Sequence, residues 1–109
     1  MPYATVHCNA TSQNLAAAIA SDLAKLLKDR TKSPATADVI VADRRFVEVP
    51  MASPANRDIV VAILHHGGLL LTEADVEHLG REITAKYPNW QMLFTSDVSH
   101  QWFANGSYA

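Results

Sequence analysis

Pro2 directly follows the initiator methionine, and its chemistry depends on whether that methionine is removed. With Met1 in place, the Pro2 nitrogen belongs to an amide and has no basicity. Once Met1 is removed, which a following proline normally permits, the same nitrogen is a secondary amine on a rigid ring. An exposed α-amino group titrates at roughly pH 7.7–8.0, and burial lowers its pKa because it disfavours the ammonium form. Pro2 could therefore act as a neutral base near pH 7, as proton abstraction beside a carbonyl requires.

Other reactive side chains carry weaker signals. Adjacent residues of a strand point to opposite faces, so neither Arg44 with Arg45 nor His65 with His66 can hold one ligand together. We expect the arginines to form a solvated rim and His65 to be a packed strand residue. The single cysteine, Cys8, excludes an internal disulfide and a CxxC metal site and is expected to be inert packing. No metal and no cofactor are therefore expected.

Composition predicts one globular domain spanning residues 1–109. The chain is 49% hydrophobic and 18% charged, with a formal net charge of -2. A basic excess typical of nucleic-acid binding is absent, and no apolar run reaches the roughly 18 residues that a membrane span needs. The N-terminus also lacks the pattern of a secretory signal. We expect a cytoplasmic protein without nucleic-acid or membrane partners.

Apolar periodicity predicts an α/β (α+β) chain. Strands are expected at residues 3–8, 38–43 with a continuation at 46–49, 58–65 and 90–95, and helices at 12–30 and 72–87. Thr11 or Ser12 is expected to cap the first helix, and Thr72 with Asp75 the second. A duplicated β-α-β order predicts two right-handed parallel crossovers in a four-stranded sheet with both helices on one face. The aromatic residues of the tail predict that it packs on this body.

Two strands are apolar on both faces. The runs "VIVA" (39–42) and "IVVAIL" (59–64) are typical of strands buried on both sides. Two helices can cover only one face of the sheet, and the chain is too short to supply a third layer. We therefore predict an oligomer in which sheets pack against sheets.

Two architectures fit this order of elements: the ferredoxin-like fold of small binding modules and the trimeric tautomerase superfamily. The leading Pro2 resembles the second, and the chain resembles its macrophage migration inhibitory factor branch. "TKSP" (31–34) resembles the branch's T-G-K-P-P and places Lys32 at its active-site lysine. "ILHHGG" (63–68) resembles L-H-S-I-G, and "WFANGSYA" (102–109) resembles the C-terminal G-W-N-N-S-T-F-A. The resemblance spans nearly the whole chain.

The sequence also departs from this branch. Trp90 and Met92 stand at the positions of its Tyr-x-Asn pair, Gly67 at its isoleucine, and Phe103 at its tail tryptophan. The polar hydrogen-bonding groups of the pocket are therefore altered. Asp38 stands where the oxalocrotonate-type branch has an arginine, which argues against a simple dicarboxylate site.

The resemblance implies a homotrimeric isomerase that catalyses keto-enol tautomerisation of a hydrophobic or aryl 2-oxo acid. Pro2 would be the general base, and Lys32 would hold the substrate carboxylate or the developing oxyanion. The implied substrate-binding residues are His65, Gly67, Trp90, Met92, Phe103 and Tyr108. Two alternatives stay open: a catalytically drifted or inactive trimeric binding protein of the same fold, and a ferredoxin-like module that binds a small ligand.

Overall fold

The predicted strands and helices occur in the predicted order, and two short strands follow them in the tail. The computed structural model describes residues 2–41, 60–66, 71–87, 92–98 and 101–108. The elements are β1 (Tyr3–Cys8), the 3-10 helix η1 (Ala10–Ser12), α1 (Gln13–Thr31), β2 (Thr36–Val41), β3 (Val60–His65), α2 (Glu73–Lys86), β4 (Met92–Ser96), β5 (Phe103–Ala104) and β6 (Ser107–Tyr108). The ends of β1 to β4 and of both α-helices lie within two residues of the predicted ones, whereas η1, β5 and β6 were not predicted. The predicted strand residues 42–43, 46–49, 58–59 and 90–91 lie outside the described residues.

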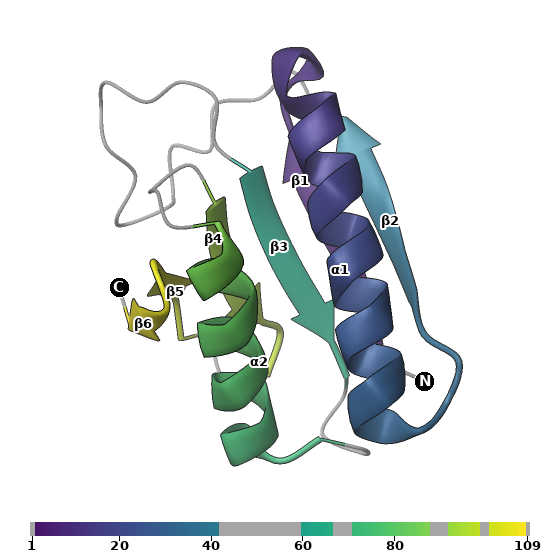
Figure 1. The fold of residues 1–109 in the computed structure, drawn as a ribbon, viewed down its shortest axis with the longest axis vertical. Helices are drawn as coiled ribbons and strands as arrows, with labels where there is room; N and C mark the ends of the chain where they lie inside the picture. The colour runs from purple at the N-terminus through teal and green to yellow at the C-terminus, as the bar shows by residue number, and fades with distance from the viewer. Residues whose placement is uncertain (1, 42–59, 67–70, 88–91, 99–100, 109) are drawn as a thin grey trace.

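The described strands form one mixed sheet in the order β2-β1-β3-β4-β5-β6. β1 pairs with β2 in parallel, β3 pairs with β4 in parallel, and β1 pairs with β3 antiparallel, which joins the two parallel pairs. Both helices lie on one face of this sheet, and both crossovers are right-handed (Figure 1). Each helix thus joins two neighbouring strands. This differs from the ferredoxin-like alternative, whose βαβ units are split by another strand.

The tail extends the sheet, so the prediction of four strands is wrong and six are present. β5 pairs antiparallel with β4 through Phe94 and Phe103, and β6 pairs with β5. Asn105 and Gly106 connect the two strands with φ values of 53° and 79°. The prediction that the tail packs on the body is confirmed. A two-residue strand has too little periodicity to be recognised in a sequence, which explains the missed hairpin.

Of the two predicted helix caps, the one on α2 is present, whereas the Ser12 side chain does not cap α1. α2 begins with the predicted capping box, in which the Asp75 backbone N–H donates to Thr72 Oγ1 at 3.1 Å and the Thr72 N–H donates to Asp75 Oδ2 at 2.9 Å. Ser12 occupies the N-cap position of α1, but its side chain makes no capping hydrogen bond. The reason is local: η1 leads directly into α1 and leaves Ser12 with a φ of -107° and a ψ of 15°, outside the extended conformation that capping needs.

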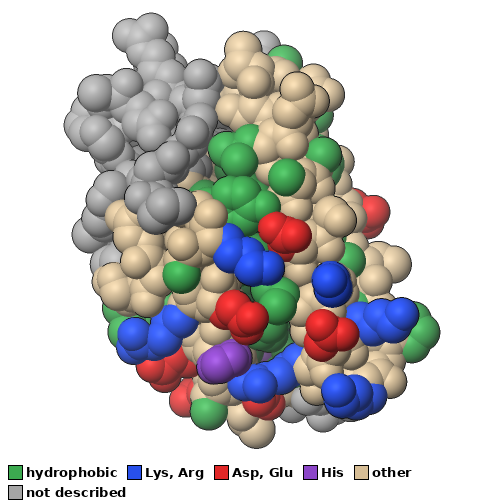
Figure 2. Space-filling view, viewed as in Figure 1, with side chains coloured by type: hydrophobic (Ala, Val, Ile, Leu, Met, Phe, Trp, Pro, Cys, Tyr) green, Lys and Arg blue, Asp and Glu red, His purple; other side chains and the backbone are tan. Residues whose placement is uncertain are grey.

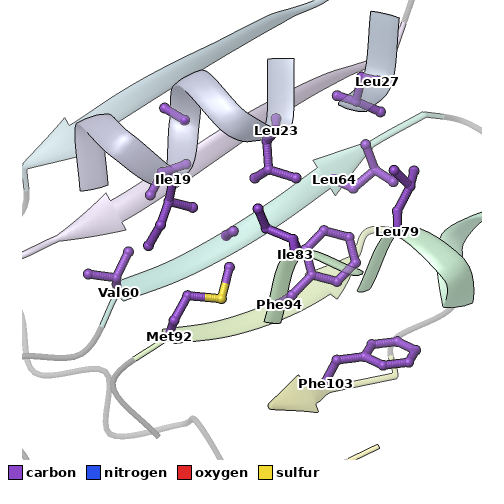
Figure 3. Packing of buried hydrophobic residues seen from close by; sticks show 14 of the residues in the cluster. Ile19, Leu23, Leu27, Val60, Leu64, Leu79, Ile83, Met92, Phe94 and Phe103 are labelled. Carbon is purple, nitrogen blue, oxygen red and sulfur yellow. The ribbon is translucent and has the colours of Figure 1, made fainter. Parts of the chain in front are cut away.

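The main core lies between the helices and the sheet (Figure 3). α1 contributes Ile19, Leu23 and Leu27, and α2 contributes Leu79 and Ile83. These side chains follow the predicted helical spacing and pack on the helix-facing residues of the strands.

The opposite face of the sheet is apolar in part. Val61, Leu93 and Ala104 form a second buried cluster there, so β3 carries buried apolar residues on both faces as predicted. β2 differs, because Val39 and Ile40 are 38% and 39% exposed in the single chain. None of the described helices is long and apolar enough to cross a membrane.

Candidate active site

Pro2 is buried directly before β1, an interior strand of the sheet that lies between β2 and β3. The next residue, Tyr3, pairs with Thr36 at the start of β2 and with His65 at the end of β3. Pro2 therefore lies at the end of the sheet where β1 and β2 begin and where β3 and β4 finish. α1 ends at Thr31, and the short segment 32–35 leads from it to the start of β2 at this same end of the sheet (Figure 1). We call this region the Pro2 end, and it includes Pro2, Tyr3, Lys32, His65, His66, Ser96 and Asp97.

A buried imidazole and a buried hydroxyl belong to the Pro2 end. His66 is 9% exposed and Ser96 is 1% exposed, and His66 Nε2 lies 2.9 Å from Ser96 Oγ. Ser96 Oγ also accepts the Val98 N–H at 3.2 Å, and the His66 N–H donates to Asp97 Oδ1 at 3.4 Å. Tyr3 and His65 are the last pair of the antiparallel β1/β3 ladder, so Pro2 and His66 are the residues next to that pair on the two chains.

A second set of polar side chains lies on the sheet face that points away from the helices, and it consists of Tyr3, Thr5, His7 and His65. Thr5 Oγ1 lies 2.9 Å from His65 Nε2 and 3.1 Å from His7 Nε2. The Tyr3 ring stacks on the His65 ring with 4.6 Å between centroids, and His65 Nδ1 lies 3.7 Å from Asp97 Oδ2. Burial, and secondarily the nearby His65, lowers the pKa of His7 below its ordinary value. His65 and His66 point to opposite faces, so they cannot chelate one ion together, as predicted.

Lys32 is the C-cap residue directly after α1, and it is exposed. It adopts the left-handed conformation with a φ of 57°, and its backbone N–H donates to the Lys28 carbonyl oxygen at 2.8 Å. Only three residues separate Lys32 from Thr36, the partner of Tyr3 in the β1/β2 ladder. The fold thus brings the predicted lysine to the same end of the molecule as Pro2.

Three of the implied substrate-binding residues, Met92, Phe103 and Tyr108, are not gathered around Pro2 within one chain. Met92 is fully buried in the helix-side core at the start of β4, whereas the Pro2 end lies at the finish of that strand. Phe103 is also a core residue, 1% exposed and 6.1 Å from Phe94 between ring centroids. Tyr108 stands on β6, four strands from β1 and so about 19 Å away at the usual strand spacing. Gly67 and Trp90 lie outside the described residues.

His66 and Ser96 were missed as candidates, and the sequence held only part of the signal for them. The alternation of β1 predicts that Tyr3, Thr5 and His7 share a face. It cannot predict which residue of β3 stands opposite each of them. Without that register, nothing in the sequence indicates that His66 and Ser96 meet beside Pro2.

No model of a known protein family matches the chain, and no curated protein matches it. Within the described ranges, no three side chains of His, Cys, Asp or Glu are grouped so that they could hold a metal ion. The groups available for chemistry at the Pro2 end are thus the Pro2 nitrogen once Met1 is removed, two imidazoles, the Tyr3 and Ser96 hydroxyls, a carboxylate and the Lys32 ammonium group.

Proposed function

We propose that the protein is a tautomerase in which the Pro2 nitrogen, freed by removal of Met1, is the general base for keto-enol tautomerisation of a hydrophobic or aryl 2-oxo acid. The observation that carries this proposal is the burial of Pro2 directly before β1, at the end of the sheet that also holds His65, His66, Ser96 and Asp97. Burial disfavours the ammonium form of an amine, so a buried prolyl nitrogen is neutral and basic near pH 7. A chain that needed Pro2 only to begin a strand would have no use for titratable neighbours.

The reaction needs one base and one stabiliser of negative charge. The Pro2 nitrogen takes the proton from the carbon next to the 2-oxo group, and the C–H electron pair forms the new C=C bond. The carbonyl π pair moves onto oxygen, which then accepts a proton to complete the enol. Lys32, at the same end of the molecule, holds the substrate carboxylate or the developing oxyanion by charge. No covalent intermediate is required.

The assembly that accompanies this activity is a homotrimer in which sheets contact sheets. Support comes from the exposed apolar side chains of β2, which is an edge strand among the described strands. The helix face, in contrast, carries basic and acidic side chains in close mixture (Figure 2), including the Arg30–Asp75 ion pair at 3.2 Å. Tyr108, 44% exposed, lies on the opposite edge strand β6. Repeated contact between these two edges would close a ring and bring a tail aromatic toward the next copy's Pro2 end.

The test is an assay of phenylpyruvate ketonisation and enolisation on protein whose N-terminus is verified by intact mass. Pro2→Ala removes the pyrrolidine base, and we expect kcat/KM to fall by about 100-fold or more, the range typical of general base catalysis. Pro34→Ala is the matched control, because Pro34 is exposed and its nitrogen stays in an amide in either form. We expect Pro34→Ala to keep wild-type activity.

Three outcomes separate the alternatives. Equal activity of wild type and Pro2→Ala would refute the proposed mechanism. Saturable binding of the 2-oxo acid without turnover, in protein that lacks Met1, would identify the non-catalytic binding protein instead. A monomer or dimer in sedimentation would contradict the proposed trimer.

A further inference from the structure

We infer that His66 is the catalytic acid that protonates the substrate oxygen opposite Pro2, and that Ser96 positions its imidazole. This inference rests on the proposed tautomerase function and adds a second proton-transfer residue to it. The macrophage migration inhibitory factor branch, which the chain resembles, has a serine at the position of His66. The role therefore belongs to this chain's own residues.

The first support is that two buried polar side chains lie together at the Pro2 end. The buried polar residues of the described chain are Ser12, His66, Thr84, Thr95 and Ser96. Two of these five form one hydrogen-bonded pair at the Pro2 end, His66 with Ser96 at 2.9 Å. Burying a polar side chain costs free energy unless it is hydrogen-bonded, and the His66–Ser96 hydrogen bond meets this condition for both side chains.

The second support is the geometry of the two strands. Tyr3 and His65 are the last direct partners of the antiparallel β1/β3 ladder, so Pro2 and His66 are the residues that immediately follow that pair on the two chains. The two-residue alternation of a strand gives Pro2 the parity of Ala4 and His66 the parity of Leu64, which are core residues on the helix side of the sheet. Pro2 and His66 are thus at the same end and on the same side of the sheet, as an amine base and an acid acting on neighbouring atoms of one small substrate must be.

The third support is the chemistry of the two groups. Imidazole gives and takes protons near neutral pH, as an acid paired with an amine base must. Ser96 Oγ accepts the Val98 N–H at 3.2 Å, and the His66 backbone N–H is held by Asp97 Oδ1 at 3.4 Å. The imidazole and its own backbone are thereby both anchored to the segment that ends β4. Ser96 acts through His66 and is a positioning residue.

The proton balance of the step closes without another reactant. Pro2 takes the proton from carbon as the C–H bond breaks, and protonated His66 gives its proton to the enolate oxygen as the O–H bond forms. The product is the neutral enol, with a prolinium ion and a neutral imidazole left behind. The proton on Pro2 returns to His66 through solvent and restores the starting state.

The experiment compares two reactions of phenylpyruvate on the full chain without Met1. Enol formation, followed by absorbance, needs both Pro2 and His66. Exchange of the carbon-bound hydrogens with D2O, followed by NMR, needs removal and return of a proton at carbon and so needs Pro2. In His66→Gln we expect enol formation to fall about 100-fold while exchange changes less than about threefold. His78→Gln, which alters an exposed histidine of α2, is the matched control and should change neither reaction.

Ser96→Ala provides a second variant that keeps the imidazole. We expect the same selective loss of enol formation, about tenfold, because the ring is no longer oriented. Both variants retaining full enol formation, or losing both reactions in equal proportion, would overturn the role of His66 and leave the proposed function standing. A wild-type protein without either reaction would refute the proposed function and this role together.

Discussion

Phe103 packs its ring directly against the backbone of α2 at Gly80. A Cβ atom at Gly80 would lie 2.8 Å from both Cγ and Cδ2 of Phe103, closer than real Cβ contacts allow. Phe103 is 1% exposed and sits in β5, so this close approach holds the tail against the second helix. Glycine costs about 1 kcal/mol in a helix interior relative to alanine. The close packing of the Phe103 ring explains why a residue without a Cβ atom stands at position 80.

The first prediction concerns this contact. Gly80→Ala gains helix propensity but forces the Phe103 ring to move, and we expect a net loss of about 1–3 kcal/mol of unfolding free energy. Urea unfolding measures the loss. In the Phe103→Leu background, which shortens the opposing side chain, the same substitution should cost less or stabilise. Stabilisation by Gly80→Ala in the wild-type background would show that the ring does not pack as described.

The second prediction concerns Thr84, whose fully buried side chain links α2 to the tail. Thr84 Oγ1 donates to the Gly80 carbonyl oxygen at 2.6 Å and accepts the Gly106 N–H at 2.8 Å. Thr84→Val keeps the shape and removes both bonds, so we expect a loss of about 1–3 kcal/mol. Amide hydrogen exchange at Gly106 should also become faster. Thr36→Val, at an exposed position of β2, is the control and should change neither measurement.

The third prediction concerns the link between the two helices. Tyr87 Oη donates to Asp22 Oδ2 at 2.5 Å, and burial, then the hydrogen bond to and charge of Asp22, raise the pKa of Tyr87 to about 12. The native state therefore holds a proton that the unfolded state releases near pH 10, so this contribution to stability is lost as pH rises from 10 to 12. We expect Tyr87→Phe to cost about 1.5–3 kcal/mol at pH 8.

The check on Tyr87 is a pair of measurements. The stability difference between wild type and Tyr87→Phe should shrink when unfolding is measured above pH 10. In Asp22→Asn, the phenol absorbance titration should shift to lower pH because the acceptor's charge is gone. An unchanged titration midpoint in that variant would mean that Asp22 does not hold the Tyr87 proton.

The fourth prediction concerns His7. Burial, and then the neighbouring His65, lowers the pKa of His7, so the native state keeps it neutral at a pH where the unfolded chain is already protonated. Stability from this group is full above the ordinary histidine pKa of about 6.5 and falls as the pH decreases below it. We expect His7→Gln to show a flatter decline of unfolding free energy between pH 7 and pH 5 than wild type does. His78→Gln is the exposed control, and equal slopes in all three proteins would contradict the prediction.

Several features were predictable because they depend on neighbours in sequence. The capping box of Thr72 and Asp75 is formed by residues three apart, and the buried stripe of α2 follows from helical spacing. The shared face of Tyr3, Thr5 and His7 follows from the two-residue period of a strand. In each case the interaction that decides the structure lies within one turn or one strand.

The candidate site was predictable only in part for the same reason. The sequence indicates Pro2 and Lys32 as candidates, but it cannot indicate that Met92 and Phe103 are core residues far from Pro2. Nor can it indicate that His66 lies beside Ser96, thirty residues later in the chain. These placements depend on strand order and register.

The sequence by itself determined the two long helices, the strands β1 to β4, the capping box of α2 and the two apolar faces of β3, because each arises from side-chain spacing along a single segment. Only the tertiary structure decided that β1 pairs with β3, that the tail adds two strands, and that His66 lies beside Ser96. Those pairings are selected by the simultaneous burial of α1, α2 and Phe103 against one sheet, a condition on the whole chain that no single segment expresses.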